Sequence, residues 1–392
     1  MAEHALLSPS GASRWLVCTP SARFEQEFPD TESEAAKEGT LAHKLAEIIL
    51  QLKLKLITKQ KYEVELKQVK KNPLYNVVMH SHCDDYSVFV LERLYSYEDA
   101  AIDLEFKIPL KIWIPEGFGT IDIRICAPKD RVLEIIDFKY GKGVEVSAQE
   151  NKQMMVYGLG SLGVKADYHV YETVKMTIYQ PRLDNVSTFK MPGSDLLLWG
   201  REVLKPAAEL AFDGRGEFVP GDYCRFCRAK GICRATASQN LELAKYDFKA
   251  DRYLTPEEVS DILDRAAPFT NWLKGVLDYA QAEALTGKKW PGYKLVSGRS
   301  NRVYSDEAAI AETLIMTEFS EDVIYKKTLL NLTDMENAIG AANFAMLVEP
   351  FITKPTGKPT LVPVGDKRIE LNSLSAAIKE FQDDADLDDL IS

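Results

Sequence analysis

Apolar and polar residues repeat with different periods along the chain, and these periods predict a mixed α/β protein. Within residues 31–53, apolar side chains recur every three or four positions, which predicts an amphipathic helix. Its apolar stripe consists of Ala42, Leu45, Ala46, Ile49 and Leu50. Residues 102–113, 119–126 and 131–140 read as strands, and residues 148–159 as a helix. Val174, Met176 and Ile178 then alternate with polar residues, as in a half-buried strand.

The pattern changes near residue 240, because all six cysteines and all five histidines precede it. Beyond that point the sequence reads as capped helices. Thr255-Pro256-Glu257-Glu258 has the signature of a helix start, and a further helix is expected over residues 269–285, ending near Gly287. Four prolines in residues 350–368 predict an extended or looped segment. We therefore expect two parts, residues 1–240 and a mainly helical region 241–392.

Charge and composition narrow the class of protein. The chain has 392 residues, 46% of them hydrophobic, and a net charge of −11. Residues 1–240 contain 31 Lys and Arg against 33 Asp and Glu, a balance of −2, so the remaining 17 against 26 give −9 to the C-terminal part. The overall acidity thus does not exclude nucleic-acid binding by the first part. No apolar run approaches the roughly 20 residues of a membrane span, and no signal peptide is recognisable, so we expect a cytoplasmic protein without a membrane partner.

Two acids and a lysine stand at the ends of expected strands. Asp137 and Lys139 project from the same face of their strand, because side chains alternate with period two. Asp122 follows a turn on the preceding strand, and pairing of the two strands would bring it beside Asp137. Converging carboxylates need a cation, and Mg²⁺ or Mn²⁺ suits carboxylate oxygens and a phosphate. A phosphodiester hydrolysis site is one interpretation; an ordinary Asp–Lys ion pair at a strand end is the other.

The neighbouring residues carry a family resemblance. Gly119-Thr120-Ile121-Asp122, Ile136-Asp137-Phe138-Lys139 and Gln153-Met154-Met155-Val156-Tyr157 resemble the GxxD, DxK and QxxxY motifs of RecB-like nucleases of the PD-(D/E)XK superfamily, in the same order. Glu38-Gly39-Thr40-Leu41-Ala42-His43 resembles the first helical motif of that branch. The resemblance covers about residues 8–234. It implies an α/β fold of the restriction-endonuclease type, with a central mixed β-sheet flanked by helices and a helical C-terminal extension.

The same resemblance implies the roles of individual residues. Metal ligands would be His43, Asp122, Asp137 and the backbone carbonyl of Phe138, and some members of the superfamily add an acid from the region of Glu105. Lys139 would stabilise the developing charge or position the attacking hydroxide. Gln149, Gln153 and Tyr157 are spaced four apart and would share one helix face, from which Gln153 and Tyr157 orient the substrate and support the lysine.

Four of the six cysteines have metal-ligand spacing. Cys224, Cys227 and Cys233 lie within CRFCRAKGIC, and Cys18 supplies a fourth thiolate from the N-terminal side; Cys83 and Cys126 are expected to pack as small apolar groups. The placement of one cysteine before the nuclease motifs and three after them resembles that in the iron–sulfur nucleases of the AddB type and of CRISPR adaptation. The resemblance implies a [4Fe–4S] cluster that staples the ends of the domain. A zinc site made of the four cysteines fits the spacing equally well.

Two classes of function follow. The resemblance is to phage-encoded recombination nucleases, which implies a Mg²⁺- or Mn²⁺-dependent DNA exonuclease that resects ends, alongside a phage single-strand annealing or DNA-binding protein, in an infected bacterial cell. The alternatives are a non-cleaving DNA-binding or assembly protein and a structure-specific endonuclease. Phosphate contacts are expected from Arg225, Arg228, Lys230 and Arg234 around the cysteines, and the lysines of residues 53–71 are either DNA contacts or a solvated face. Residues 381–392 read as an acidic tail, solubilising or docking a basic partner.

Overall fold

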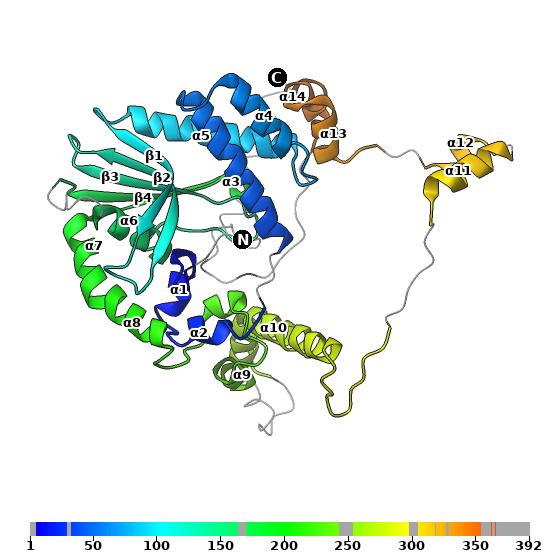
Figure 1. The fold of residues 1–392 in the computed structure, drawn as a ribbon. Coiled ribbons are helices and arrows are strands. Elements are labelled where there is room, and N and C mark those ends of the chain that lie inside the picture. Colours follow the sequence, from blue (N-terminus) through cyan, green and yellow to red (C-terminus); the bar gives the residue numbers. More distant parts are fainter. Residues whose placement is uncertain are drawn as a thin grey trace, which may run out of the picture.

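Five strands form one sheet in the order β1-β2-β3-β4-β5 (Figure 1). We describe the chain from a computed structural model. The described residues are 5–29, 33–163, 170–242, 254–297, 305–317, 319–326 and 329–353, with positions 362 and 365. The strands are β1 (Ala101–Pro109), β2 (Phe118–Ala127), β3 (Val132–Phe138), β4 (Thr173–Gln180) and β5 (Asn185–Pro192). β3 and β4 are parallel and the other neighbouring pairs antiparallel, so the expected central mixed sheet is confirmed.

Helices cover both faces of the sheet (Figure 1). On one face lie α3 (Glu34–Lys53), α4 (Lys59–Val69) and α5 (Val77–Tyr95). On the other lie α6 (Lys152–Gly163), α7 (Gly193–Trp199) and α8 (Lys205–Asp213), with the short α1 (Ala12–Trp15) and α2 (Ser21–Glu25). Strand β3 has buried apolar side chains on both faces, so helices must cover both faces of the sheet. Its Leu133 and Ile135 belong to the core under α6, whereas its Ile136 and Phe138 belong to the core under α3 and α5.

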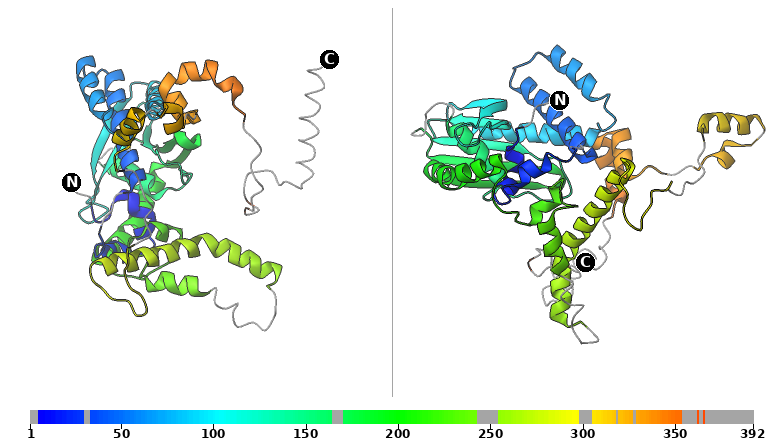
Figure 2. Two further views of the ribbon diagram at one scale, coloured as in Figure 1. Left: turned by 90° about the vertical axis from the view of Figure 1, so that its right-hand side faces the viewer. Right: turned by 60° about the horizontal axis from the view of Figure 1, so that its bottom comes forward.

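The C-terminal part is helical, as expected. Helix α9 (Arg234–Leu241) ends at the expected division. Beyond it, the described residues form α10 (Pro256–Leu285), α11 (Glu307–Met316), α12 (Glu321–Ile324), α13 (Leu332–Ile339) and α14 (Ala341–Leu347). Helix α10 contacts α9 and the 3₁₀ turn η4 (Asp222–Phe226), and it runs along the lower part of the molecule in the left view of Figure 2. Helix α13 contacts α5. The division near residue 240 stays a prediction, and the acidic tail lies outside the described residues.

Several predicted boundaries need correction. β1 ends at Pro109 instead of residue 113, because Leu110 N donates to the Gly117 carbonyl oxygen and closes a turn. Helix α6 begins at Lys152, since the side chain of Asn151 accepts a hydrogen bond from Met154 N and caps it; Gln149 therefore lies in the turn before the helix and not on its face. β5 was not predicted.

The two helices predicted between residues 255 and 285 are one continuous helix, α10, which contains Pro268. The predicted start is correct. The hydroxyl of Thr255 accepts a hydrogen bond from Glu258 N, and the Glu258 carboxylate accepts one from Thr255 N. Among the residues that the structure describes, none of the helices combines the length and apolar content that crossing a bilayer requires.

Candidate active site and cysteine cluster

Asp122 and Asp137 come from neighbouring strands at the same level of the sheet. In the antiparallel pair of β2 and β3, Ile123 is opposite Ile136, so the next positions along the two strands are Asp122 and Asp137. Asp122 Oδ2 accepts a hydrogen bond of 2.7 Å from Phe138 N, which fixes one carboxylate against the end of β3. The structure thus brings the two acids together where β3 ends.

Glu105 lies where the ribbon of β1 and β2 changes face. Its φ is +46°, in the left-handed region that residues other than glycine seldom adopt. Leu104 packs against the core under α3, and Phe106 against the core under α6, although residues two apart normally share a face. Glu105 and Asp122 face the helix α3 at this switch, and His43, Glu105 and Asp122 each offer a ligand atom within 4.8 Å of the other two.

Helix α3 positions His43. The helix starts at the Ser33 cap, whose hydroxyl accepts a hydrogen bond from Ala36 N, and its buried stripe includes Ala42 and Ala46 on either side of the histidine. The imidazole packs edge to face on Phe138, with ring centroids 5.4 Å apart, and its Nδ1 lies 3.3 Å from Asp122 Oδ1. The stripe that buries the helix therefore also aims the histidine at the strand-end acids.

A second contact fixes the same helix relative to the sheet. Arg182, just after β4, forms an ion pair of 2.6 Å with Glu38 of α3, and its guanidinium lies 4.9 Å from the centroid of the Tyr140 ring, within the range of a cation–π contact. Glu38 precedes His43 by little more than one helical turn. The pair thus ties the histidine-bearing turn of α3 to the end of the central sheet.

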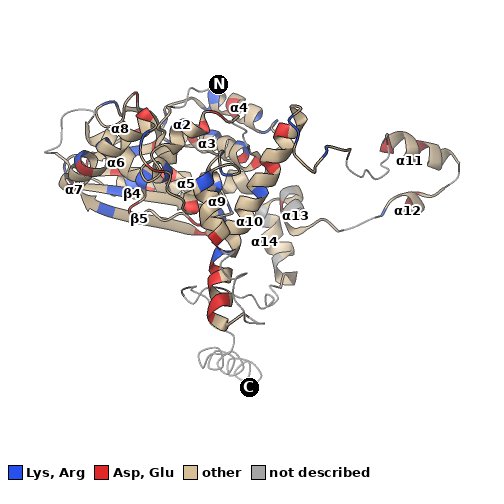
Figure 3. Cartoon of the chain, turned by 90° about the horizontal axis from the view of Figure 1, so that it is seen from below, with Lys and Arg blue, Asp and Glu red and all other residues tan. Residues whose placement is uncertain are grey.

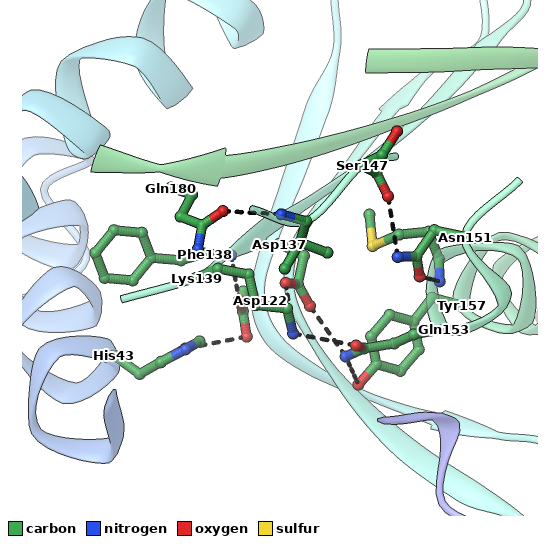
Figure 4. A network of polar contacts seen from close by, with 12 residues as sticks. His43, Asp122, Asp137, Phe138, Lys139, Ser147, Asn151, Gln153, Tyr157 and Gln180 are labelled. Atoms are coloured by element: carbon green, nitrogen blue, oxygen red, sulfur yellow. Dashed lines mark hydrogen bonds and ion pairs between the residues drawn. The ribbon is translucent and has the colours of Figure 1, made fainter. Parts of the chain in front are cut away.

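Lys139, Gln153 and Tyr157 complete the polar network on the other side of Asp137 (Figure 4). Lys139 Nζ lies 2.9 Å from Asp137 Oδ2 and donates a 3.1 Å hydrogen bond to Gln153 Oε1. The Gln153 amide nitrogen donates to Asp137 Oδ1 at 3.1 Å and to Tyr157 Oη at 3.3 Å. The amide therefore fixes the carboxylate and the ammonium at once.

The glycine of the GxxD stretch makes room for this network. A Cβ atom on Gly119 would lie 2.9 Å from Pro9 Cγ and 3.1 Å from Tyr157 Cε1. A larger residue would therefore push on the ring of Tyr157, whose hydroxyl oxygen accepts the Gln153 hydrogen bond. This close approach gives a physical reason for glycine at this position of the motif.

Burial and mutual charge shift the pKa values of the site. Burial raises the pKa of Asp137, although Lys139 opposes the shift, and burial together with Asp122 raises the pKa of Glu105 to about 7. Burial alone would lower the pKa of His43, but the carboxylate of Asp122 outweighs it and raises the value to about 9. For Asp122, burial is outweighed by His43, which lowers its pKa. The pKa shifts thus favour the charged forms of His43 and Asp122, whereas burial favours the neutral forms of Asp137 and Glu105.

The donor set suits a hard divalent cation. Two carboxylates and an imidazole within 4.8 Å are ligand types that Mn²⁺ and Mg²⁺ accept. Asp137 Oδ2 is buried and makes no hydrogen bond, so beyond its ion pair with Lys139 it retains lone pairs for a cation. An open groove of about 470 Å³, lined by Gly39, Thr40 and Lys44 among others, runs from His43 and Glu105 along α3. The site is therefore accessible from solution.

Gln180 supports the site and was not among the predicted site residues. It is 1% exposed. Its amide nitrogen donates to the carbonyl oxygens of Gly141 and Val144 at 2.9 Å, and its amide oxygen accepts from Val146 N at 3.1 Å. One buried amide thereby fixes the loop that follows Lys139. No spacing rule points to such a residue, because three of its partners are backbone groups and the fourth is the side chain of Asn185.

The four cysteines with metal-ligand spacing line one cavity. Cys18, Cys224, Cys227 and Cys233 surround it together with apolar side chains such as Phe24 and Phe218. All four are free thiols. Burial raises the pKa of Cys18, and that of Cys227 to about 12, so a bound cation would be needed to keep these groups as thiolates. Cys224 Sγ accepts hydrogen bonds from Gly221 N and Thr236 Oγ1, as thiolate ligands commonly do.

The segment that carries Cys18 is bound to the segment that carries the other three. Thr19 Oγ1 donates to the Arg215 carbonyl oxygen at 2.6 Å, and Glu25 Oε1 accepts from Arg228 N at 2.7 Å. The other two cysteines behave as expected. Cys83 is fully buried, and Cys126 packs against the core under α6.

Some of the basic residues around the cysteines donate hydrogen bonds to backbone carbonyl groups, and others are exposed. Arg228 donates to the Phe28 carbonyl oxygen and Lys230 to the Arg225 carbonyl oxygen, while Arg234 is exposed at the start of α9. The Arg225 guanidinium lies 4.7 Å from the centroid of the Phe226 ring. Both signs of charge are spread over this face of the molecule (Figure 3).

Comparison with known proteins places the chain in a family. The family described as "Protein of unknown function (DUF2800)" matches residues 4–369. The chain belongs to the DUF2800 family. Among solved structures, one titled "Crystal structure of SSO0001" is 14% identical and covers 57% of this chain and 96% of that chain, with a TM-score of 0.22. A likeness this low carries no argument about fold or function.

In this DUF2800 chain, residues far apart in sequence meet at one place. The structure brings His43, Glu105 and Asp122 into one group and joins Asp137, Lys139, Gln153 and Tyr157 by hydrogen bonds and ion pairs. Asp137 lies beside the group of three rather than within it. The Phe138 peptide contacts the site through its N–H, which donates to Asp122.

Proposed function

We propose that this DUF2800 chain is a divalent-metal-dependent deoxyribonuclease of the RecB-like PD-(D/E)XK type. The observation that carries the proposal is the ion pair of Lys139 with the buried Asp137, set beside the group of His43, Glu105 and Asp122. A structural ion pair needs no third carboxylate or imidazole nearby. Several acids around one point, with an ammonium held in a fixed place, favour phosphoryl chemistry.

Each side chain has a defined role in this proposal. His43, Glu105 and Asp122 would hold Mg²⁺ or Mn²⁺, with Asp137 and the Phe138 carbonyl completing the ligand set. A bound cation supplies an activated water and charge neutralisation at the phosphate. Lys139 is held by Asp137 and Gln153, so its ammonium is positioned to stabilise the negative charge that develops on the phosphoryl oxygens. Gln153 and Tyr157 position the lysine.

The proposed substrate is DNA, resected from its ends. The open groove beside His43 supports a polymeric substrate, and the nearly balanced charge of residues 1–240 does not exclude a nucleic acid. The motif resemblance also implies a biological setting. In this setting the enzyme would work as an exonuclease with a phage annealing or DNA-binding protein, in the cytoplasm of an infected bacterial cell. Binding through phosphate contacts would weaken as salt rises.

The test is a digestion of linear and circular duplex DNA in Mg²⁺ or Mn²⁺. An exonuclease degrades the linear form alone, whereas an endonuclease attacks both. Lys139→Ala and Asp137→Asn should lower the rate by about 10³-fold or more, because the first removes the ammonium that acts on developing charge and the second removes the carboxylate that holds it. Lys142→Ala is the matched control, since it removes the same charge from an exposed position three residues along the loop. A protein that retards DNA in a gel but never shortens it would establish the non-cleaving alternative.

The cysteine cavity is proposed to hold a [4Fe–4S] cluster that fastens the N-terminal segment to residues 224–233. Purified protein should be brown and contain iron and sulfide; colourless protein with one zinc would establish the four-cysteine zinc alternative. Cys227→Ser should lose the metal and unfold at lower denaturant concentration, because ligation contributes to folding. Cys126→Ser is the control, as Cys126 lies outside the cavity. Full stability of Cys227→Ser would contradict the proposed role.

A further inference from the structure

A second cavity lies between the cysteine segment and α10, away from the candidate active site. It is enclosed by η4, α9 and α10, has a volume of about 580 Å³, and includes Cys224 in its wall. Ligand pockets typically span roughly 300–1,000 Å³. None of the three residues of the candidate active-site metal group, His43, Glu105 and Asp122, lines it. The cavity is thus large enough for a small ligand and has no part in the proposed hydrolysis.

Cations and aromatic rings line one part of this cavity. Arg225 and Lys230 contribute the positive charges, and Phe226 and Trp272 the rings. Lys230 Nζ donates a 3.0 Å hydrogen bond to the Arg225 carbonyl oxygen, which holds the two cations at the same end. The Phe226 ring is 65% exposed, so it offers a free face. Cations beside rings with open faces are the combination that binds a phosphate and stacks a base.

Polar side chains line another part of the cavity. The Trp272 indole nitrogen is buried and has no hydrogen-bond partner among the described residues. This donor is not accessible from the cavity, so the polar groups that an occupant can reach there are side-chain amides. Asn240 uses its amide nitrogen on the Thr236 carbonyl oxygen, which leaves its amide oxygen as an acceptor, and the amides of Gln239 and Asn271 also line the wall. Amides of this kind match the donor and acceptor edges of a nucleobase.

Acidic residues limit how far an occupant extends. A neighbouring cavity of about 430 Å³ shares Asp222, Gln239 and Asn240 with the first and is lined further by Glu242 and Asp264. Its cation, Arg265, lies 3.3 Å from Glu242 and 3.0 Å from Asp261, so its charge is already compensated. The negative charges of this neighbouring 430 Å³ cavity repel phosphate. A strand entering at Arg225 and Lys230 would therefore place one nucleotide in the first cavity and stop.

We propose that this cavity binds one unpaired nucleotide of a DNA strand. The phosphate contacts Arg225 and Lys230, and the base lies against the aromatic rings, with its edge facing the amides of Gln239, Asn240 and Asn271. The inference rests on the proposed function for its substrate, DNA. It adds a site that senses whether the end of a duplex is frayed or single-stranded, located on the segment that holds the cysteines.

The experiment uses full-length protein with its cysteine-bound metal intact, in buffer without Mg²⁺ or Mn²⁺, so that binding is measured without cleavage. The probe is a hairpin duplex with one unpaired terminal 2-aminopurine, compared with the same base paired inside a blunt duplex. The fluorescence of the unpaired probe should be quenched on binding, because 2-aminopurine loses emission when it stacks. The paired probe should keep its emission.

Variants assign the quenching to the cavity. Trp272→Leu should abolish the quenching. If this variant folds poorly, Asn271→Leu, a change at a partly exposed position, replaces it in the test. Asn271→Leu should weaken binding of the unpaired probe at least fivefold. Lys230→Gln should weaken binding and reduce the salt dependence by about one counterion. Lys274→Gln is the matched control, because it removes the same charge from an exposed position of α10 outside the cavity. Equal effects of Lys230→Gln and Lys274→Gln would overturn the proposal.

Three further outcomes test the occupant of the cavity and separate this inference from the proposed function. If 2-aminopurine deoxyribonucleoside monophosphate is quenched as tightly as the strand, the cavity takes a free nucleotide and the strand assignment is wrong. DNA cleavage without quenching would overturn the cavity alone. Quenching that depends on Trp272, in a protein that never cleaves DNA with Mg²⁺ or Mn²⁺, would overturn the nuclease and leave the nucleotide site.

Discussion

At the scale of the residue, Glu105 combines an unfavourable backbone with a useful side chain. Its φ of +46° is a conformation that costs of order 1 kcal/mol for a residue with a Cβ atom and that glycine adopts freely. Glycine at this position would therefore be at least as stable. A glutamate that occupies such a place, within 4.8 Å of His43 and Asp122, suggests that the carboxylate is kept for binding rather than for folding.

Glu105→Gly should consequently separate stability from metal binding. We expect the free energy of unfolding, from urea titrations without divalent metal, to stay equal or rise by up to about 1 kcal/mol, because the backbone strain is relieved. Mn²⁺ affinity, measured by calorimetry, should fall at least about tenfold, since a carboxylate ligand is lost.

Glu116→Gly is the matched control for that prediction. Glu116 also has a positive φ, +54°, but it is exposed in the turn before β2, away from the metal group. The change should relieve the same kind of strain and leave Mn²⁺ affinity unchanged. Unaltered Mn²⁺ binding by Glu105→Gly would show that Glu105 is not a ligand.

At the scale of the element, the sequence predicted what is set by local pattern. Helix α3 and strands β2 and β3 follow from their apolar periodicity, and pairing of β2 with β3 suffices to place Asp122 beside Asp137. β5 was missed because its residues alternate between half-buried and exposed positions without a fully buried one, so it lacks an apolar face to reveal it. The turn of the β1–β2 ribbon at Glu105, and the buried amide of Gln180, depend on tertiary contacts that no local pattern records.

Helix α10 packs on the cysteine segment through a contact between two glycines. A Cβ atom on Gly231 would lie 2.4 Å from the Gly275 carbonyl oxygen, whereas one on Gly275 would meet Lys230 Cγ at 2.8 Å. The first obstacle is helix backbone and the second a flexible side chain. The two substitutions to alanine should therefore differ in their effect, although they add the same methyl group.

Gly231→Ala should lower the free energy of unfolding by about 1–3 kcal/mol, because the helix must move away from the cysteine segment. Gly275→Ala should cost less or stabilise, since the lysine can shift and alanine gains up to about 1 kcal/mol of helix propensity. Urea unfolding and amide hydrogen exchange in α10 measure both effects. Equal destabilisation by the two variants would mean that the close approach of the backbones is not what limits this packing.

At the scale of the whole molecule, contacts from opposite ends of the first part converge on the cysteine cavity. Cys18 lies before the sheet and Cys224, Cys227 and Cys233 lie after it, and Arg228 binds both Glu25 and the Phe28 carbonyl oxygen. Helix α10 adds a third segment, with Tyr279 and Phe28 ring centroids 6.3 Å apart. The cysteine segment is thus held from both sides, although the sequence predicts a division near residue 240.

Two truncated chains test whether α10 stabilises the cysteine segment. A chain ending at residue 297 keeps α10, so its melting temperature and its content of cysteine-bound metal should equal those of the full chain. A chain ending at residue 242 loses the Gly231–Gly275 contact and the Tyr279 ring, and exposes the wall of the cavity beside Cys224; it should melt about 5 °C lower and release its metal faster to a chelator. Calorimetry and the kinetics of metal release measure both. If the chain ending at 242 matched the full chain, residues 1–240 would be an independent domain, and α10 would pack on it without supporting the cysteine segment.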